Sequence, residues 1–308
     1  MHGITSCIHS ILATCGTPVP GAVPPVARTA FSAWGRMHMT RFDDSYDSNP
    51  AENYERFFTT AIGRPLAEVL VERADVQPGE RVLDVACGTG ICARLVATTV
   101  GPKGAVAGLD ANPAMLAVAR QVAPAGMDIA WYEAPAERMP LDAESFDVAL
   151  CQMGLQFMPS PAEALREMWR VLDAEGRLLV SVPGPAPPLF AALEEALEHH
   201  VGAAAAGFAR QVFALHELGE VGGLLVDAGF ADVRVDEAEH RLPLPEPERF
   251  LWQYIHGTPL AVAMAGLDAA ARQRFERDVL DAWAEHETVR GLELCVRLVT
   301  ATGRKTVG

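Results

Sequence analysis

From Arg81 onward, short apolar runs rich in β-branched residues alternate with longer segments that have helical spacing. The first five runs end at residues 86, 110, 133, 153 and 183, and helical segments follow the first, second and fourth of them. Such alternation predicts an α/β fold with a doubly wound, mostly parallel sheet. In sheets of this kind, ligands bind at the carboxyl ends of the strands.

Two more strands are predicted near the end of the chain, at 231–239 and 292–305, which makes seven in total. A helix at 218–230, closed by Gly229, precedes the sixth strand. The expected architecture is therefore a seven-stranded, Rossmann-like sheet with additional helical segments.

The chain is expected to contain one main domain, residues 42–308, with a cofactor-binding core at about 75–183. Helical insertions at about 184–213 and 245–288 are expected to form a cap over this core. Residues 1–41 include a proline-rich stretch without helical or alternating pattern, which predicts a flexible extension.

A glycine turn, "ACGTG", follows the first predicted strand and opens a helix. The spacing of Gly88, Gly90 and Ala93 fits the fingerprint of dinucleotide-binding folds, but the same turn can hold another adenosine-carrying ligand. Asp84 precedes the turn, and a carboxylate there would repel a pyrophosphate while it attracts a cationic ligand. A carboxylate that only caps local N–H groups is the alternative explanation of Asp84.

Asp110 lies 22 residues after Gly88, at the end of the second predicted strand. A carboxylate at that place can accept hydrogen bonds from two ribose hydroxyls. Both kinds of adenosine ligand predict such a residue, so Asp110 supports a nucleoside site without choosing between them.

The charge balance limits the partners of the chain. Lys and Arg total 25 against 40 Asp and Glu, and the net charge of −15 disfavours nucleic acid and anionic membrane surfaces. The six cysteines show no C-x-x-C spacing, no apolar run is long enough to span a bilayer, and the nine histidines include no H-E-x-x-H. We therefore expect a cytoplasmic protein with reduced thiols and no metal; the oligomeric state stays unknown.

The motifs "VLDVACGTG", "GLDANPAML", "AERMPLDAESFDVAL" and "REMWRVLDAEGRLLV", in this order, resemble those of class I S-adenosylmethionine-dependent methyltransferases. The group that includes ubiquinone/menaquinone-biosynthesis enzymes and bacterial small-molecule methyltransferases is the most similar. This resemblance implies S-adenosylmethionine as cofactor and methyl transfer to a small hydrophobic or aromatic metabolite by in-line displacement. An NAD-dependent oxidoreductase and a non-catalytic S-adenosylmethionine-binding protein remain alternatives.

The resemblance also implies which residues bind the cofactor, at or just after the ends of the predicted strands: Asp84, Ala86, Cys87, Gly88, Gly90, Asp110, Ala111, Met115, Ala136 and Glu137. Cys151, Gln152 and Gln156 follow the fourth strand, and the topology is expected to place them in the same cavity, around the methyl group. Two departures from the family pattern occur. Pro135 stands where an acid is usual, which leaves Glu133 or Glu137 for the adenine amino group. The segment "LDAEGRL" lacks the usual Pro-Gly-Gly but keeps Gly176.

Tyr54 and His256 are the candidate catalytic residues. Tyr54 resembles tyrosines that cover the cofactor in related enzymes, and His256 lies among aromatic residues of the second insertion. A packed core histidine is the alternative for His256. The insertions also supply large apolar side chains that can line an acceptor site or form a core of their own: Leu189, Phe190, Phe208, Phe213, Phe250, Trp252, Tyr254 and Trp283.

Overall fold

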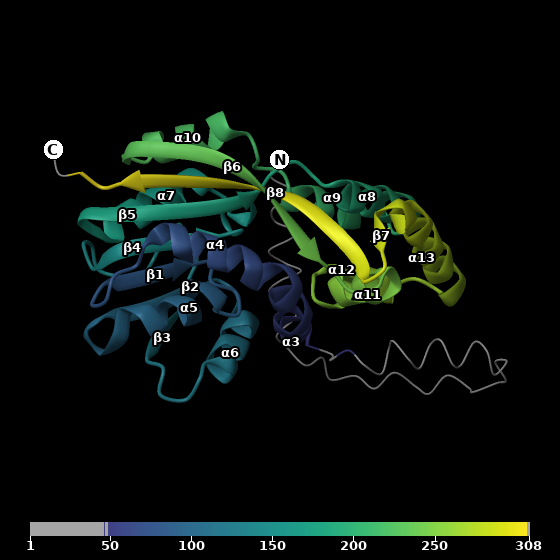
Figure 1. Ribbon diagram of the computed structural model, residues 1–308, viewed down its shortest axis with the longest axis horizontal. Helices are drawn as coiled ribbons and strands as arrows, with labels where there is room; N and C mark the ends of the chain where they lie inside the picture. Colours follow the sequence, from purple (N-terminus) through teal and green to yellow (C-terminus); the bar gives the residue numbers. More distant parts are fainter. Residues whose placement is uncertain (1–45, 47–48, 307–308) are drawn as a thin grey trace.

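A twisted sheet forms one half of the molecule and a helical cap forms the other (Figure 1). The computed structural model describes residue 46 and residues 49–306. The extension predicted at residues 1–41 lies outside the described residues. The sheet order is β3-β2-β1-β4-β5-β8-β6.

Five strands of the sheet run parallel to one another. They are β1 (Arg81–Val85), β2 (Ala105–Asp110), β3 (Ile129–Glu133), β4 (Phe146–Gln152) and β5 (Leu172–Pro183). Two long strands, β6 (Ala231–Pro243) and β8 (Gly291–Arg304), complete the sheet in antiparallel pairing. The prediction of a doubly wound, mostly parallel seven-stranded sheet is therefore confirmed, and a two-residue strand, β7 (Glu287–Thr288), additionally pairs with β8.

Alternate residues of the central strands point to opposite faces of the sheet, as the period of two requires. Val82 and Leu150 pack against α4 (Arg64–Ala74) and α5 (Ile91–Val100). Leu83 and Cys151 pack on the other face, against α7 (Pro161–Val171) and α10 (Leu218–Asp227). The remaining helical segments of this half are α6 (Pro113–Val122), η2 (Gly101–Lys103) and η3 (Leu155–Phe157).

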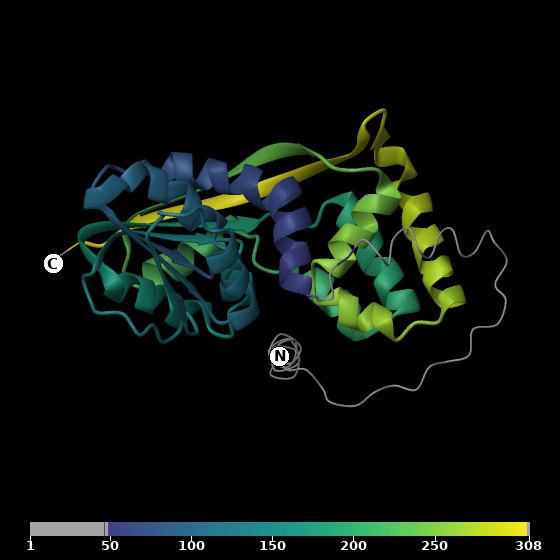
Figure 2. The same cartoon turned by 90° about the horizontal axis from the view of Figure 1, so that it is seen from below.

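The cap is built by helices from both predicted insertions. They are α8 (Pro188–His200), α9 (Ala203–Val212), α11 (Pro247–His256), α12 (Leu260–Ala265), α13 (Ala269–Trp283) and the short η4 (Ala284–His286). Their apolar faces share a hydrophobic core with the cap ends of β6 and β8. Figures 1 and 2 both show these two strands running from the sheet into the cap, so the cap is fastened to the core by continuous backbone hydrogen bonding.

One helical segment lies between the two halves (Figure 2). It begins with α3 (Pro50–Asn53), whose N-terminus is capped by the Asn49 side chain, and continues as a π-helix, η1 (Tyr54–Gly63), into α4. The Asn53 side chain donates to the His256 carbonyl in the cap at 3.3 Å. The Thr59 and Thr89 hydroxyls form a buried hydrogen bond at 3.3 Å, so the segment contacts both the cap and the glycine turn.

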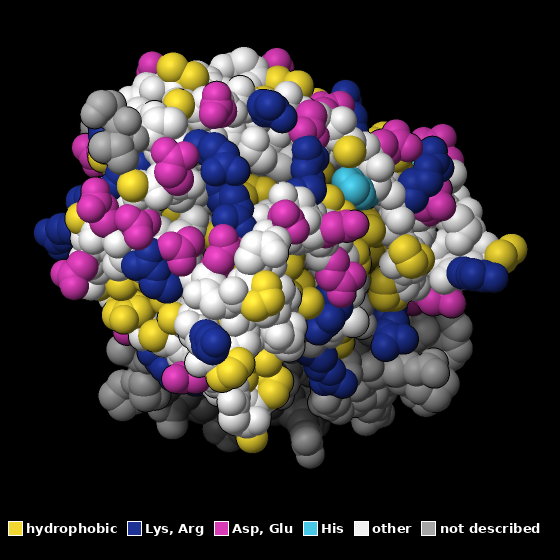
Figure 3. Space-filling view, turned by 60° about the vertical axis from the view of Figure 1, so that its left-hand side comes forward, with side chains coloured by type: hydrophobic (Ala, Val, Ile, Leu, Met, Phe, Trp, Pro, Cys, Tyr) yellow, Lys and Arg dark blue, Asp and Glu magenta, His cyan; other side chains and the backbone are white. Residues whose placement is uncertain are grey.

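The surface carries mixed charges. Figure 3 shows a face on which acidic and basic side chains are interspersed. Within residues 49–306, no helix combines the length and the apolar character that a crossing of a bilayer requires.

Candidate cofactor and acceptor site

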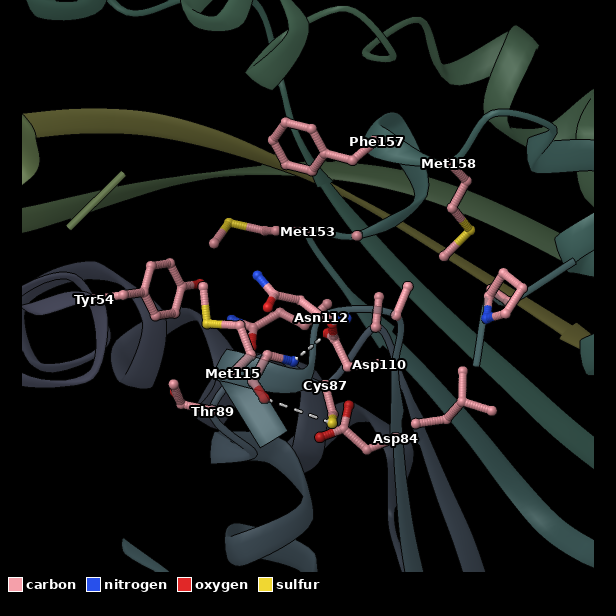
Figure 4. Close-up of a pocket in the computed structure, with 18 of the residues that line it drawn as sticks. Tyr54, Asp84, Cys87, Thr89, Asp110, Asn112, Met115, Met153, Phe157 and Met158 are labelled. Atoms are coloured by element: carbon pink, nitrogen blue, oxygen red, sulfur yellow. Dashed lines mark hydrogen bonds between the residues drawn. The ribbon is translucent and has the colours of Figure 1, made fainter. Parts of the chain in front are cut away.

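A cavity of about 550 Å³ lies where the carboxyl ends of β1, β2 and β4 meet η1 and the cap. Figure 4 shows its two sides. Asp84, Asp110 and Thr89 lie on the side of the strand ends, and Met153, Phe157 and Met158 lie on the opposite side. The cavity therefore has one polar end and one apolar end.

The glycine turn forms part of the polar end and needs a left-handed backbone. Ala86, Gly88 and Gly90 have φ values of 54°, 55° and 82°. A Cβ on Gly88 would meet only the Tyr54 ring, at 3.9 Å, so a side chain there would enter the space between the turn and η1. The bare backbone at Gly88 thus leaves room for a ligand.

Asp110 is the carboxylate that organises this turn. Its Oδ2 accepts a hydrogen bond from the Gly88 N–H at 2.8 Å, and its Oδ1 accepts one from the Asn112 N–H at 2.8 Å. Each carboxylate oxygen can accept a further bond, so ribose hydroxyls fit at this place. Burial raises the pKa of Asp110, and the two backbone N–H groups act in the opposite direction.

Asp84 is almost fully buried, with 2% of its surface exposed. Its Oδ2 accepts a hydrogen bond from the Ala93 N–H at 2.9 Å. Burial, together with the nearby charge of Asp110, raises the pKa of Asp84 to about 7, while the hydrogen bond from Ala93 and the charge of Arg94 act in the opposite direction. Two carboxylates that crowd one cavity favour a ligand with positive charge, which matches the sulfonium and ammonium groups of S-adenosylmethionine.

We expect the affinity for S-adenosylmethionine to fall as the pH drops from 8 to 6. Asp84 becomes protonated across its pKa of about 7 and then no longer attracts a cation. The expected loss is about tenfold, or roughly 1.4 kcal/mol. Titration calorimetry at four pH values measures it.

Asp84→Asn provides the comparison for this pH dependence, because an amide oxygen can still accept from Ala93 but does not titrate. The difference between the two proteins separates Asp84 from titration of the cofactor's own amine. Since the pKa of Asp84 is raised above its ordinary 3.8, its contribution to stability is present at low pH and lost as pH rises through about 7. The unliganded variant should therefore unfold at a higher temperature than the wild type at pH 8. Identical pH profiles of binding for both proteins would rule out Asp84 as the source of the pH dependence.

The region predicted for the adenine also lines the cavity. Ala111, Met115, Ala136 and Glu137 are all among the lining residues. The Glu137 carboxylate accepts a hydrogen bond from the Ser160 N–H at 3.2 Å. This bond joins the loop after β3 to the start of α7, and it holds one carboxylate oxygen of Glu137 in place.

Tyr54 covers the glycine turn from η1. Its ring stacks on Phe58, with centroids 4.7 Å apart, and it lines the cavity. Burial, followed by the charge of Asp110, raises the pKa of the Tyr54 phenol. The phenol therefore stays protonated at neutral pH, where it can donate a hydrogen bond but cannot serve as a base.

The apolar end is lined by residues of the loop after β4 and of the cap: Met153, Phe157, Met158, Phe208, Gln211 and Thr258. The Phe157 and Phe208 rings stack at 6.2 Å. Gln152, at the end of β4, also lines the cavity; its amide donates to the Gly63 carbonyl at 2.9 Å and accepts from the Cys92 thiol at 3.2 Å. These contacts fix the Gln152 side chain in one orientation.

Four residues expected at the site do not line the cavity: Gly90, Cys151, Gln156 and His256. A Cβ at Gly90 would clash with the Trp131 ring of β3, so the packing of this ring against the turn requires a glycine. Cys151 is fully buried in the core below α7, and burial raises its thiol pKa to about 12. His256 stacks on Tyr46 with centroids 4.3 Å apart, while Gly257 and Thr258 beside it do line the cavity.

Gln156 is 4% exposed, and neither polar atom of its side-chain amide has a hydrogen-bond partner in the described part of the chain. Its backbone carbonyl accepts from the Gln211 side chain. The residue therefore connects the loop after β4 to α9 through its backbone.

Asn112, Met153, Phe157, Met158 and Gln211 line the cavity but were not predicted. Asn112 could have been found, because it follows Asp110 and directly precedes a proline, the pattern of a helix N-cap; its Oδ1 accepts from Ala114. The residues of the apolar end carry no comparable signal, since their sequence resembles that of ordinary core segments.

Most large side chains of the insertions form the core of the cap. The cap core contains seven of the eight named in the sequence: Leu189, Phe190, Phe213, Phe250, Trp252, Tyr254 and Trp283. Phe208 alone of the eight lines the cavity. The cap therefore supplies one large apolar side chain to the acceptor end, and its remaining aromatic residues hold the cap together.

Comparison with known proteins gives two family matches and several relatives. Residues 83–180 match the methyltransferase domain family, and residues 39–126 match the protein-L-isoaspartate(D-aspartate) O-methyltransferase family. The chain is 33% identical over 196 residues to a demethylmenaquinone methyltransferase of Deinococcus radiodurans. This alignment covers 63% of this chain and 73% of that protein.

A ubiquinone/menaquinone biosynthesis C-methyltransferase, UbiE, of Ectopseudomonas mendocina is 41% identical over 125 residues, covering 39% of this chain and 49% of that protein. The chain thus spans about half the length of the first curated relatives that it matches.

Two solved structures share the fold. The YcgJ protein of Bacillus subtilis aligns with a TM-score of 0.54 and 18% identity, over 79% of this chain and 98% of that chain. The second is phosphoethanolamine N-methyltransferase 2 of Haemonchus contortus, in complex with phosphomonomethylethanolamine and S-adenosylhomocysteine. It aligns with a TM-score of 0.54 and 18% identity, over 83% of this chain and 57% of that chain. At these identities the likeness concerns the fold alone.

Proposed function

Because the chain belongs to the class I S-adenosylmethionine-dependent methyltransferases, we propose that it transfers a methyl group from S-adenosylmethionine to a small apolar or aromatic acceptor. The observation that carries this proposal is the two-ended cavity. Two buried carboxylates surround the glycine turn at one end, and methionine and phenylalanine side chains line the other. The relatives are named for ubiquinone and menaquinone biosynthesis and for demethylmenaquinone, which supports an apolar ring system as acceptor.

Each residue at the polar end has a separate task in this proposal. Asp110 accepts hydrogen bonds from the ribose hydroxyls while it holds the glycine turn. Asp84 compensates positive charge, and Ala136 and Glu137 border the adenine. Tyr54 closes the site from η1 and donates a hydrogen bond from its neutral phenol. When bound, S-adenosylmethionine supplies an electrophilic methyl group on a sulfonium.

The chain contributes to the reaction mainly by holding the acceptor in line and keeping water out. Among the described lining residues there is no His or Lys, and the pKa values of Tyr54, Cys87 and Cys92 are raised by burial. None of these groups can take a proton from the acceptor at neutral pH. If the acceptor must lose a proton, the lining groups that remain to take it are the carboxylates Asp84, Asp110, Glu133 and Glu137.

Calorimetry with S-adenosylhomocysteine and with NADH distinguishes this function from an oxidoreductase. We expect S-adenosylhomocysteine to bind and NADH not to bind, because Asp84 repels a pyrophosphate at the start of α5. Transfer of labelled methyl from S-adenosylmethionine into a metabolite extract then distinguishes an enzyme from a non-catalytic binding protein. A metabolite profile of a deletion strain identifies the acceptor by its missing methylated product.

We also propose the domain organisation expected from the sequence, with a core at about 75–183 and cap segments at 184–213 and 245–288. Residues 49–306 include four free thiols, Cys87, Cys92, Cys151 and Cys295, which support a reducing, cytoplasmic location.

Residues 49–63 and 245–288 are expected to exchange amide hydrogens more slowly when S-adenosylhomocysteine is added. The first segment covers the glycine turn, and the second contributes Gly257 and Thr258 to the cavity, so a ligand adds contacts to both. Strand residues 82–85 and 148–150 serve as the internal control, because they are buried already and should barely change. Hydrogen exchange with mass spectrometry measures both. Equal exchange with and without ligand would contradict closure of these segments over the site.

A further inference from the structure

The apolar end of the cavity carries no charge. Its lining side chains are Met153, Phe157, Met158, Phe208, Gln211 and Thr258. Among the residues that the structure describes, no Lys, Arg or His lines any part of the cavity. The charged lining residues are four carboxylates, Asp84, Asp110, Glu133 and Glu137, all at strand ends or in the loop after β3. The protein side of the site is therefore neutral to negative throughout.

Two arginines that lie within two residues of lining residues along the chain are engaged elsewhere. Arg94 on α5 bonds to the Glu55 carboxylate at 2.7 Å and to the Thr89 carbonyl. Arg210 precedes Gln211 on α9, but it is half exposed and pairs with Glu194 at 2.8 Å and with Glu198 at 3.3 Å. Neither guanidinium lines the cavity, so an anion at the apolar end would meet no positive partner from these residues.

The polar atoms that do reach the apolar end belong to neutral groups. The Gln211 amide donates one N–H to the Gln156 carbonyl, which leaves its second N–H as a donor and its carbonyl oxygen as an acceptor. The Thr258 hydroxyl donates to the Ile255 carbonyl at 3.2 Å and can likewise accept. These neutral groups suit hydroxyl, amine or amide groups of a ligand, and they offer no positive charge to a carboxylate or phosphate.

We propose that the methyl acceptor is a neutral or cationic, largely apolar molecule that carries no anionic substituent apart from its reacting atom. Burying a carboxylate or phosphate against methionine and phenylalanine without a cation is strongly unfavourable. The reacting atom is the exception, because it meets the sulfonium of the bound cofactor. This inference rests on the proposed function and narrows its substrate class to exclude carboxylated and phosphorylated acceptors.

The test uses two probes of equal shape, naphthalene-2-carboxamide and naphthalene-2-carboxylate. Each is titrated at pH 7.5 into full-length protein loaded with S-adenosylhomocysteine, which has no sulfonium charge. We expect the carboxamide to bind at least tenfold more tightly than the carboxylate. Equal or tighter binding of the carboxylate overturns the inference, and so does failure of both probes to bind at millimolar concentration.

A cation placed at the apolar end should weaken or abolish this preference. Gln211→Lys is expected to improve carboxylate binding at least tenfold relative to the carboxamide, since it adds the missing partner. Ala204→Lys, on the exposed side of the same helix, makes the same change in net charge and should leave the preference unchanged. Met158→Lys repeats the test from the loop after β4 if Gln211→Lys does not fold.

Two readouts separate this inference from the proposed function. Binding of S-adenosylhomocysteine is measured first, and its absence would contradict the proposed function itself. If S-adenosylhomocysteine binds but the probes show no preference, only the inference on the acceptor is wrong. An unchanged preference in both lysine variants of the cavity would also overturn the inference, because the apolar end would then not be where the probes bind.

Discussion

Gly88→Val is expected to abolish detectable binding of S-adenosylhomocysteine while the protein stays folded. Gly88 has a φ of 55°, which a β-branched residue adopts only with strain, and its Cβ would point into the cavity beside Tyr54. The valine side chain would occupy the space in which the cofactor is expected to contact the backbone of the glycine turn. We expect a loss of at least about 100-fold, or roughly 2.7 kcal/mol, in calorimetry.

Gly126→Val is the matched control for this experiment. Gly126 has a φ of 85° and open space around its Cβ, and it does not line the cavity. The control therefore introduces the same kind of backbone strain away from the site, and it should bind S-adenosylhomocysteine normally. Circular dichroism melting curves of both variants monitor folding. Normal binding by Gly88→Val would mean that the glycine turn is not the cofactor site.

Asp110→Ala should weaken binding of S-adenosylmethionine by roughly 1.5 to 3 kcal/mol, or about tenfold to 150-fold. The substitution removes the acceptor for ribose hydroxyls and also the oxygen that holds the Gly88 N–H at 2.8 Å. Asp110→Asn keeps one acceptor oxygen, so it should lose less affinity for S-adenosylmethionine than Asp110→Ala does. Competition binding with S-adenosylhomocysteine measures all three proteins.

The choice of ligand separates the roles of the two carboxylates. Methylthioadenosine has the ribose but neither the ammonium nor a sulfonium, so Asp110→Ala should weaken its binding as much as that of S-adenosylmethionine. Asp84→Asn should weaken binding of S-adenosylmethionine but not of methylthioadenosine, because the Asp84 carboxylate attracts the positive charge that only S-adenosylmethionine carries. If Asp110→Ala leaves methylthioadenosine binding intact, Asp110 does not bind the ribose.

The polar end of the site was predictable because it depends on local patterns and on one rule of topology. A strand, a glycine turn and a helix can be recognised from residues 81–100 alone, and Asp110 ends the next strand. Parallel strands then bring their carboxyl ends to one edge of the sheet. Asp84, Gly88 and Asp110 line the same cavity for this reason.

Residues whose side-chain direction depends on long-range packing were not predictable in the same way. Cys151 directly precedes Gln152, the last residue of β4, but it points into the core below α7, while Gln152 points to the cavity. Gly90 belongs to the glycine fingerprint, yet its role here is to admit the Trp131 ring from β3. His256 stacks on a residue more than two hundred positions earlier in the chain.

The amino-acid order alone specified the alternating sheet, the glycine turn and the two carboxylates, because each follows from periodicity and charge within a few neighbouring residues. The apolar end depended on the tertiary structure. It joins the loop after β4, α9 and the segment after α11, and about fifty residues separate each of these from the next along the chain. Methionine and phenylalanine pack equally well in a core or around a ligand, so only the folded arrangement distinguishes Phe208, which lines the cavity, from Phe213, which fills the cap.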